Sequence, residues 1–457
     1  MTNKLNCFKA YDVRGELGTN FNGEICYRIG RAFAKVIGAK TVVVGRDTRE
    51  TSSDLLDSLV RGLLDEGVTV FDIGLAGTEE MYWATSQFGA CGGIEVTASH
   101  NPINYNGLKM VKSDSEPLDV ESEFNRIKKI AEANDFGKIK LTGNRIDRSL
   151  ESREAYVTRI LKFVDKDFLR PLKVVVNSGN GTAGPTFDAL ALGLSNFTDK
   201  LTFERMHHTP DSSFPNGIPN PLLPKYHLEN KTSILKSGAD LGIAFDGDFD
   251  RCFFFDEKGS FVPGQYIVAL LAEVFLMKQP RAVIIHDSRV IWNIQHLVKK
   301  SGGISVCSRT GHAFVKQAMR EENAIYGGEL SSHHYFKDFA YCDSGMIPWL
   351  LIIELMGRSL KSLSQLVEGQ KAMFPSSGEI NFKLENPRKS IQRVVEFYAD
   401  KLVSKDEFDG VSLVFEDWRL NLRRSNTEPL VRLNVESRGD KFLIVDRVKE
   451  ITELLYR

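Results

Sequence analysis

The sequence of 457 residues has little of what marks the specialised classes of protein. It contains no low-complexity tract, and its 42% hydrophobic and 26% charged residues exclude a disordered or collagen-like chain. No sign of charge dominates, because 59 Lys and Arg face 60 Asp and Glu. This balance argues against general binding of nucleic acid. We therefore expect an ordinary globular protein, with about three domains at roughly 150 residues per domain.

Cysteine is scarce, and the six thiols lie too far apart in the sequence to form a C-x-x-C pair. This spacing predicts reduced thiols rather than a zinc site or a disulfide framework. The first residues, Met1-Thr-Asn-Lys-Leu-Asn, contain no apolar stretch, so we expect no secretory signal peptide. Both observations predict a cytoplasmic protein.

Long hydrophobic runs are also missing. The two most apolar segments, 266–277 and 346–356, are too short to cross a bilayer, and they contain Glu273 and Glu354. Both segments predict buried helices, and we expect no association with a membrane.

The sequence does show a regular alternation of β-branched runs with longer helical patterns. Four strand-like runs each end in a polar or glycine-rich turn, namely residues 41–44, 173–176, 241–245 and 282–285. A strand followed by a polar loop and a helix is typical of α/β domains, in which ligands bind at the strand ends. Functional residues are therefore expected in these loops.

The C-terminal part has a different pattern. Three strand-like runs follow one another closely, at residues 411–415, 418–422 and 430–435. A final helix is predicted by Ile444, Val448, Ile451 and Leu455, which recur at helical spacing. This part is predicted to form a small α+β domain. The polar stretches 134–148 and 361–387 are predicted linkers.

The first segment with chemical content is Thr97-Ala-Ser-His-Asn-Pro102, which closes a strand-like run. Ser99 lies there on a turn beside His100, and Lys109 follows ten residues later. Serine attacks at neutral pH only with help from a base or a cation, and this segment offers both. An Asn-Pro turn with a capping serine is the alternative explanation. The segment lacks the G-x-S-x-G pattern of the α/β-hydrolases.

The second segment is Asp246-Gly-Asp-Phe-Asp-Arg251. Asp246, Asp248 and Asp250 alternate along an extended segment, so one hard cation can neutralise all three. An EF-hand is excluded, because Arg251 stands where that loop needs glycine. The arginine beside the acids predicts a site where a phosphate oxygen meets both a metal ion and a guanidinium.

The third segment, Arg423-Arg-Ser-Asn-Thr-Glu-Pro429, lies between two strands of the last domain. Its arginines and the side chains of Ser425, Asn426 and Thr427 suit a phosphate dianion. An ordinary turn explains the same residues equally well.

The fourth segment is Gly327-Gly-Glu-Leu-Ser-Ser-His-His334. Glu329 and Ser331 are able to hold neighbouring sugar hydroxyls, and His333 to approach the reacting group. A glycine turn with a capping serine is the alternative. A further histidine, His312, carries less information, because a lone histidine is usually structural.

One motif is misleading. Gly179-Asn-Gly-Thr-Ala-Gly184 matches the dinucleotide fingerprint G-x-G-x-x-G. However, Pro185 follows directly and no strand ends in an acid at the required distance, so we do not expect a nicotinamide cofactor.

Taken together and in this order, the four segments resemble the α-D-phosphohexomutase family over nearly the whole chain. The similarity is closest to the bacterial members that act on mannose phosphates in GDP-mannose and surface-polysaccharide synthesis. The N-terminal Lys9-Ala-Tyr-Asp-Val-Arg-Gly15 also matches and contributes Tyr11 and Arg14. The chain departs from the family's usual residues at Phe249, Leu330 and Ser332, and Arg289 stands where relatives often have lysine.

The resemblance implies an α/β fold of four domains around a central cleft. Three related α/β domains with mixed sheets would be followed by a smaller C-terminal α+β domain. The implied domains are a phosphoserine-bearing domain (1–145), a metal-binding domain (146–255), a sugar-recognition domain (256–368) and a phosphate-binding domain (369–457).

The resemblance also implies an isomerase that moves phosphate between O6 and O1 of mannose, through a phosphoserine and a hexose 1,6-bisphosphate that also serves as activator. One Mg²⁺ per chain would be held by Ser99 and the three aspartates. The implied catalytic residues are Ser99, His100, Lys109, Arg14, Arg251, His312 and His333. The implied substrate-binding residues are Tyr11, Glu329, Ser331, Arg289, Arg423, Ser425, Asn426 and Thr427.

Several alternatives stay open. Within the family they are a phosphoglucomutase, a dual phosphomannomutase/phosphoglucomutase and a phosphoglucosamine mutase. Outside it they are a metal-dependent phosphatase and a non-catalytic protein that binds phosphosugars. The expected partner is a small sugar phosphate, and no obligate protein partner is evident.

Overall fold

The computed structural model describes residues 4–139, 143–424 and 430–457. The chain forms two compact units. Unit 1 comprises Met1–Phe261 and Tyr335–Leu360, and unit 2 comprises Val262–His334 and Lys361–Arg457.

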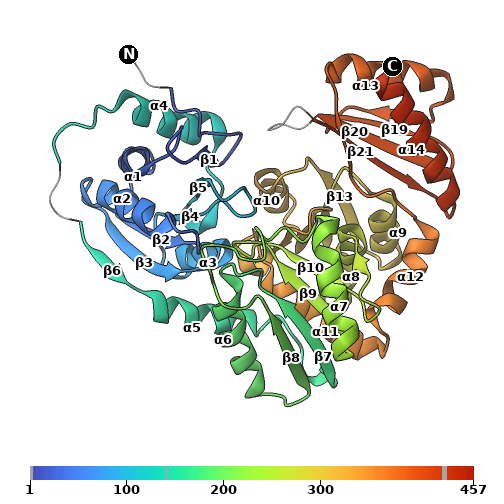
Figure 1. Ribbon diagram of the computed structural model, residues 1–457, viewed down its shortest axis with the longest axis horizontal. Coiled ribbons are helices and arrows are strands. Elements are labelled where there is room, and N and C mark those ends of the chain that lie inside the picture. The colour runs from blue at the N-terminus through green and yellow to red at the C-terminus, as the bar shows by residue number, and fades with distance from the viewer. Residues whose placement is uncertain (1–3, 140–142, 425–429) are drawn as a thin grey trace. The chain divides into compact units, whose positions relative to one another are not determined.

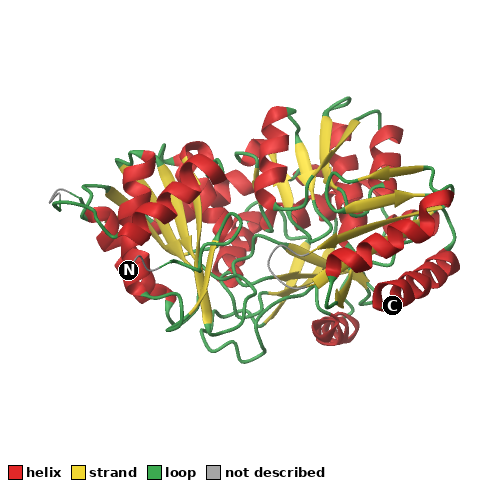
Figure 2. Cartoon of the chain, turned by 90° about the horizontal axis from the view of Figure 1, so that it is seen from above, coloured by secondary structure: helices red, strands yellow, loops and turns green. Residues whose placement is uncertain are grey.

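Unit 1 begins with a mixed sheet flanked by helices (Figures 1 and 2). Its strands, in sheet order, are β1 (Val13–Glu16), β5 (Tyr105–Lys112), β4 (Gly92–Val96), β2 (Thr41–Arg46), β3 (Thr69–Leu75) and β6 (Arg145–Asp147). The strand β5 runs antiparallel to β1 and β4, whereas β2 is parallel to β3 and β4. The accompanying helices are α1 (Gly23–Ile37), α2 (Ser52–Leu64), α3 (Thr78–Gln87) and α4 (Asn125–Ala133).

The helix α1 shows why these residues form this element. Asn22 caps its N-terminus by accepting a hydrogen bond from the Ile25 amide, and Gly38 ends it in the left-handed conformation at φ 64°. Its apolar face, with Cys26, Ile29 and Phe33, is buried in the core of this sheet. Burial of this face stabilises the helix more than its intrinsic propensity does.

The second sheet of unit 1 has the strand order β11-β10-β9-β7-β8. Its strands are β7 (Leu172–Asn177), β8 (Leu201–Met206), β9 (Leu241–Phe245), β10 (Cys252–Phe255) and β11 (Phe261–Val262). The strand β7 is parallel to β8 and β9, and β10 is antiparallel to β9. The helices are α5 (Ser149–Ile160), α6 (Ala183–Ser195) and α7 (His227–Ser237).

The third group of strands is mixed as well. In unit 2, β12 (Val283–Asp287) is parallel to β13 (Ile304–Ser308) and to β14 (Tyr326–Gly328). The helices that accompany them are α8 (Gly264–Lys278), α9 (Trp292–Lys300) and α10 (His312–Glu321). The antiparallel pair β15 (His334–Phe336) and β16 (Cys342–Asp343) is followed by α11 (Met346–Ser359) in unit 1.

The C-terminal part of unit 2 is an antiparallel sheet with the order β17-β21-β20-β19-β18. Its strands are β17 (Ile380–Lys383), β18 (Ser404–Asp406), β19 (Val411–Val414), β20 (Trp418–Arg424) and β21 (Leu430–Ser437). The helices here are α12 (Leu363–Met373), α13 (Pro387–Tyr398) and α14 (Lys441–Tyr456). Figure 1 shows α13 and α14 lying together on this sheet, and the core contains Trp418, Leu433 and Ile451.

This architecture confirms the predicted fold class of three mixed-sheet α/β domains and a smaller C-terminal α+β domain. The predicted strands correspond to β2, β7, β9 and β12 and to β19, β20 and β21, and the predicted final helix is α14. The apolar runs 266–277 and 346–356 lie in α8 and α11. The arrangement of the domains around a cleft stays a prediction.

The two predicted linkers contain regular secondary structure, which the sequence analysis did not expect. Residues 134–148 contain β6, whose three side chains are exposed while its backbone pairs with β3. Residues 361–387 contain β17 and also α12, which begins with a capping box between Ser362 and Gln365. The strand β6 lies at the edge of its sheet with all three side chains exposed, so its composition does not distinguish it from a linker.

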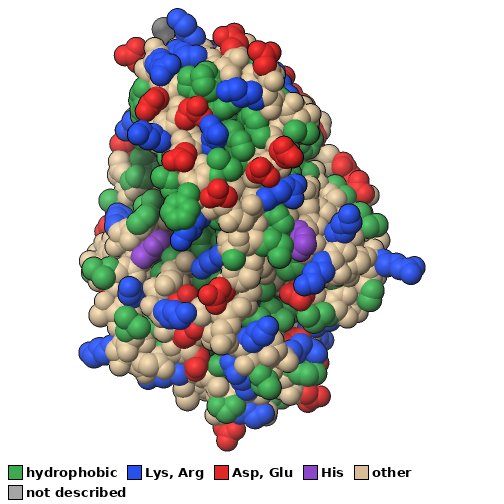
Figure 3. Space-filling view, turned by 90° about the vertical axis from the view of Figure 1, so that its right-hand side faces the viewer, with side chains coloured by type: hydrophobic (Ala, Val, Ile, Leu, Met, Phe, Trp, Pro, Cys, Tyr) green, Lys and Arg blue, Asp and Glu red, His purple; other side chains and the backbone are tan. Residues whose placement is uncertain are grey.

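Further predictions concern the thiols, the membrane and the surface. All six cysteines are free thiols. Within the described ranges no helix is both long and apolar enough to cross a bilayer. On the face shown in Figure 3, basic and acidic side chains are interspersed, in keeping with the formal charge of -1.

Candidate active site

Ser99 lies in the loop that joins β4 to β5. Its backbone has a left-handed conformation with φ 48°, and its side chain is 5% exposed. The hydroxyl donates to Asp246 Oδ2 at 2.9 Å and lies 3.0 Å from Nδ1 of His100. The predicted nucleophile, its histidine neighbour and the first predicted metal ligand are thus in contact in unit 1.

The three aspartates lie in the tight turn between β9 and β10. Asp246, Asp248 and Asp250 are all buried, and one carboxylate oxygen of each lies within 4.8 Å of the others. Within the turn Phe249 has φ 42°, a conformation for which glycine is better suited. Its ring occupies the space that a side chain at position 77 would need, because a Cβ on Gly77 would overlap the ring. The absence of a side chain at Gly77 therefore compensates for phenylalanine at position 249.

Besides the Ser99 hydroxyl, two cations and the hydroxyl of Thr78 donate hydrogen bonds to one oxygen of each acid. Lys109 donates to Asp248 at 2.8 Å and also to Asp250. Arg251 donates to Asp246 Oδ2 through Nε at 2.8 Å, and it contacts His100 Nδ1. Thr78, at the start of α3, donates to Asp248 Oδ2 at 2.6 Å. Three carboxylates against two cations leave a formal excess of one negative charge.

The environment shifts the pKa values within this cluster. Burial raises the pKa of Asp246 above its ordinary value, although Arg251 opposes it. Burial acts the same way on Asp248, but the Lys109 charge and hydrogen bonds lower the pKa of that carboxyl below its ordinary value. Burial would lower the pKa of Lys109, but Asp248 and Asp250 raise it.

The surroundings of His100, the histidine beside Ser99, disfavour its charged form. Desolvation and then the Arg251 charge lower the pKa of His100 well below its ordinary value. The side chain is nevertheless 42% exposed, so contact with water limits the desolvation.

The acidic cluster has the properties of a site for a hard divalent cation. The Oδ1 atoms of Asp246, Asp248 and Asp250 are buried and have no hydrogen-bond partner. A buried oxygen without a partner costs free energy, which a bound cation would recover. Carboxylate oxygens are also the ligands that Mg²⁺ prefers. The residues present therefore fit a metal ion.

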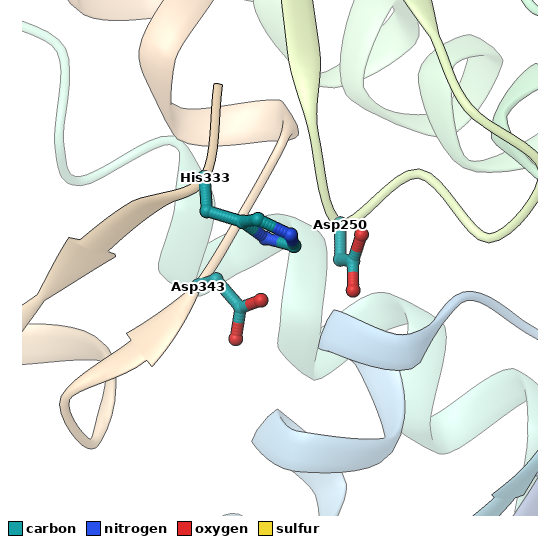
Figure 4. A group of neighbouring side chains, drawn as sticks. All are labelled: Asp250, His333 and Asp343. Carbon is teal, nitrogen blue, oxygen red and sulfur yellow. The ribbon is translucent and has the colours of Figure 1, made fainter. Parts of the chain in front are cut away.

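A fourth buried acid lies beside this cluster. Asp343, at the end of β16, has a carboxylate oxygen within 4.8 Å of one of Asp250 (Figure 4). It adds to the local excess of negative charge.

The glycine-rich turn that mimics a dinucleotide fingerprint packs against the acidic loop. A Cβ on Gly181 would lie 2.6 Å from the carbonyl oxygen of Gly247, and a Cβ on Gly247 would lie 2.6 Å from that of Ser99. Thr182 donates through its amide and its hydroxyl to the same Gly247 carbonyl, each at 3.1 Å. These glycines thus allow three backbone segments to approach closely.

Arg14, on β1, contacts the loop of Ser99 by donating to the Thr97 carbonyl, and it lies 3.5 Å from Asp12. Tyr11 precedes this strand and is half-buried. The structure therefore brings Arg14, Ser99, His100, Lys109, Arg251 and the three aspartates together within unit 1.

The other predicted residues belong to unit 2, where Arg289 organises a second network. Its guanidinium donates to Asp287 Oδ2 at 2.5 Å and to Glu379 at 3.2 Å, and it lies 3.4 Å from Ser331 Oγ. The Glu329 carboxylate is 3.8 Å from Arg289 and accepts the Gly311 amide at 2.9 Å. Arg289, Glu329 and Ser331 are thus in one cluster, as a sugar-binding loop requires.

The predicted phosphate loop is only partly described. Arg423 lies one residue before the end of β20, where burial and then the Arg289 charge lower its pKa below the ordinary value. An added anion would relieve this repulsion between two cations. Ser425, Asn426 and Thr427 lie outside the described residues. His312 begins α10 and His333 precedes β15, and both are half-buried.

Sequence reasoning assigned no role to Thr78, Asp287 or the pair Asp47 and Arg49. Thr78 anchors Asp248, and Asp287 holds Arg289 and accepts the Leu330 amide at 2.7 Å. Asp47 and Arg49 follow β2, and their contacts with the loop of Ser99 are described below. The signal that would have found them is their position at strand ends, which they share with the predicted site residues.

Comparison with known proteins identifies the family. Four domain descriptions match consecutive parts of the chain: "Phosphoglucomutase/phosphomannomutase, alpha/beta/alpha domain I" at residues 5–138, domain II at 154–259, domain III at 263–373 and the C-terminal domain at 379–453.

Individual relatives extend over the whole chain. A phosphomannomutase of Salmonella montevideo is 53% identical, and one of Escherichia coli K12 is 52% identical, each over 99% of both chains. The crystal structure of a phosphoglucomutase/phosphomannomutase family protein from Burkholderia thailandensis is 30% identical, with a TM-score of 0.86, covering 100% of this chain and 98% of that one. All four domains in order, and relatives identical at half of their positions, show that the chain belongs to the phosphoglucomutase/phosphomannomutase family, the α-D-phosphohexomutases.

Proposed function

We propose that the protein is a phosphomannomutase, which interconverts mannose 6-phosphate and mannose 1-phosphate through phosphorylated Ser99 and a hexose 1,6-bisphosphate. The observation that carries this proposal is the buried contact between Ser99 Oγ and an acidic cluster lined by Lys109 and Arg251. A protein that only binds phosphosugars needs no such nucleophile. Mannose as the sugar is supported by the relatives named phosphomannomutase.

In the proposed reaction the bond between phosphorus and Ser99 Oγ breaks, and a bond between phosphorus and a sugar oxygen forms. The sugar hydroxyl gives up its proton, and the resulting bisphosphate then returns its other phosphoryl group to Ser99. Such transfers are catalysed mainly by positioning and electrostatics. Arg14, Lys109 and Arg251 supply positive charge on this chain.

We assign the metal ion as one Mg²⁺ on Asp246, Asp248, Asp250 and an oxygen of phosphorylated Ser99. When bound, it would offset the negative charge of the transferring phosphoryl group. The hexose 1,6-bisphosphate would also activate the enzyme by phosphorylating Ser99.

Proton transfer is assigned to the histidines His100, His312 and His333. Lys109 is a poor base, because its ammonium is engaged by Asp248 and Asp250. His100 is supported by the distance of 3.0 Å from its Nδ1 to Ser99 Oγ.

Binding of the substrate is assigned to residues of several loops. Glu329 and Ser331 would hold sugar hydroxyls, with Arg289 fixing both side chains. Tyr11 is a further proposed substrate-binding residue. The loop with Arg423, Ser425, Asn426 and Thr427 would hold the phosphate that is not reacting. The proposed functional domains are the phosphoserine-bearing domain (1–145), the metal-binding domain (146–255), the sugar-recognition domain (256–368) and the phosphate-binding domain (369–457). We also propose that the enzyme is cytoplasmic.

A coupled assay tests this function. Purified protein with Mg²⁺ and glucose 1,6-bisphosphate should convert mannose 1-phosphate to mannose 6-phosphate without release of inorganic phosphate. Parallel assays with glucose 1-phosphate and glucosamine 1-phosphate measure the preference. Release of inorganic phosphate would indicate a phosphatase, and a higher kcat/KM for another sugar would overturn the assignment of mannose.

A further inference from the structure

Arg49 lies directly behind the loop that carries Ser99. It follows β2 and is 3% exposed. Its Nη1 donates to the carbonyl oxygens of Pro102 at 2.9 Å and Tyr105 at 3.0 Å. Its Nη2 donates to those of Ser99 at 3.0 Å and Asn101 at 2.6 Å. One guanidinium thus binds four backbone carbonyls, three in the loop and one at the first residue of β5.

The guanidinium is itself held in place. Asp47 lies 3.4 Å from its Nε and accepts the Arg49 amide at 2.9 Å. The second oxygen of Asp47 lies 3.3 Å from the amide of Ala98, the residue before Ser99. The ring of Phe214 covers the guanidinium with its centroid 5.8 Å away. The loop is therefore held at both kinds of backbone group: Asp47 contacts an amide, and Arg49 binds the carbonyls.

The loop needs this support because of its backbone conformation. Ser99 has φ 48°, which is unfavourable for a residue with a side chain and persists only where the surroundings impose it. The Ser99 carbonyl accepts from Arg49, and the same carbonyl lies against Gly247 of the acidic loop. The carbonyl and the side chain of Ser99 belong to the same residue, so contacts that hold the carbonyl also restrict the direction of the side chain.

We propose that Arg49 is a positioning residue for phosphoryl transfer, which fixes the backbone of Ser99 so that Oγ stays in line with the acidic cluster. This inference rests on the proposed role of Ser99 as the nucleophile. Arg49 does not touch the hydroxyl; it acts through the four carbonyls.

The geometry of these contacts requires arginine. A guanidinium presents its donors in a planar fork, whereas a lysine ammonium is a single point. Lysine at position 49 would keep the positive charge beside Asp47 but would reach fewer of the four carbonyls. The loop would then be free to shift, and a shift of about 1 Å costs roughly 100-fold in rate.

The test uses Arg49→Lys in the full-length protein. Ser99 is phosphorylated with ³²P-labelled glucose 1,6-bisphosphate, and the label is chased with mannose 1-phosphate. The amplitude counts folded, competent sites, and the rate constant reports positioning. We expect full amplitude with a rate constant about 10- to 100-fold lower, and kcat reduced with KM changed less than about threefold. A purely structural role would lower the amplitude and leave the rate constant unchanged.

Arg31→Lys is the matched control. Arg31 is 5% exposed, lies in the same unit and pairs with Glu66 at 2.6 Å without contacting the loop. Its amplitude and rate constant should equal those of the wild type.

Each outcome decides the matter. A rate constant for Arg49→Lys within twofold of the wild type overturns the inference while leaving the proposed function intact. If Arg49→Lys does not fold, Asp47→Asn replaces it; a slower chase at full amplitude supports the inference, and an unchanged rate overturns it. A wild type that takes no label on Ser99 overturns the proposed function, and this inference with it.

Discussion

Two buried acidic groups, one in each unit, differ in what their oxygens do. In unit 1 the Oδ1 atoms of Asp246, Asp248 and Asp250 have no hydrogen-bond partner. In unit 2 both oxygens of Asp287 are engaged, Oδ1 by the Arg289 amide at 3.0 Å and Oδ2 by the Arg289 guanidinium and the Leu330 amide. The first group is therefore arranged to bind something, whereas the second stabilises the shape of its own loop.

The difference concerns chemistry as well as stability. The cluster of unit 1 keeps unused coordination capacity beside a serine hydroxyl. In unit 2 the charged groups contact one another and thereby fix the positions of Arg289, Glu329 and Ser331. Variants in the first region should therefore lower kcat most, and variants in the second should change substrate affinity or stability.

The largest effect is expected for Ser99→Ala. Loss of the nucleophile should reduce kcat on the order of 10³-fold or more, while the small change keeps the fold. Mass mapping of the wild type should find the exchangeable phosphate on Ser99. Ser152→Ala, a buried serine on α5, is the control and should keep activity. Phosphate found on another residue would contradict this prediction.

The next effect is expected for Asp248→Asn. One carboxylate fewer weakens the proposed Mg²⁺ site, so kcat should fall about 10²- to 10³-fold and the Mg²⁺ concentration for half-maximal activity should rise. The matched variant in unit 2, Asp287→Asn, should leave that Mg²⁺ concentration unchanged. If the Mg²⁺ concentration for half-maximal activity rises equally in both variants, the two acidic groups do not differ in metal binding and the prediction is wrong. Full activity of metal-free wild type after dialysis against EDTA would refute the metal assignment.

A smaller effect is expected for Glu329→Gln. Mannose and glucose phosphates differ at C2, whereas Glu329 is proposed to hold O3 or O4, which both sugars share. Loss of a charged hydrogen bond worth ~1.5–3 kcal/mol should lower kcat/KM for both by a similar factor of about 10 to 150. If kcat/KM is unchanged for one sugar and falls more than about tenfold for the other, Glu329 distinguishes the configuration at C2, which would contradict this prediction.

The smallest effect on turnover is expected for Arg419→Leu, although its effect on stability is large. Arg419 and Glu436 form a buried pair at 2.7 Å in the C-terminal sheet, and the variant leaves Glu436 buried without its cation. The free energy of unfolding in urea should fall by about 3–5 kcal/mol. Arg419 also donates to the carbonyl oxygens of Ser288 and Arg289, so KM should rise, whereas kcat should change less than in the three variants above. The half-exposed pair Arg447 and Glu450 is the control, since Arg447→Leu should cost at most about 1 kcal/mol. Equal losses from both variants would contradict this view.

Much of the fold follows from local pattern. The β-branched runs that become β2, β7, β9 and β12 end in polar turns, and the alternation with helices is enough to predict α/β domains. The pattern does not reveal β6 and α12, which lie in the polar segments predicted as linkers. Their identity depends on pairing with β3 and on capping, which composition does not report.

The residue types of the site were likewise readable from the sequence. Ser99, Lys109 and the three aspartates stand out because a nucleophile, a cation and clustered carboxylates at strand ends have few structural explanations. Their mutual contacts were not readable, because Ser99 and Asp246 are separated by 147 positions.

The sequence by itself therefore determined which groups carry the chemistry and the kinds of domain that hold them, because periodicity and residue type are local properties. Only the tertiary structure decided how those groups are held. Arg49 grips the loop of Ser99 because β2 and β4 are neighbours in one sheet, and Phe249 fits its turn because Gly77 lies against it. The Oδ1 atoms of the three aspartates without a hydrogen bond are also a tertiary result, since the hydrogen bonds from Lys109, Arg251 and Thr78 go to the Oδ2 atoms.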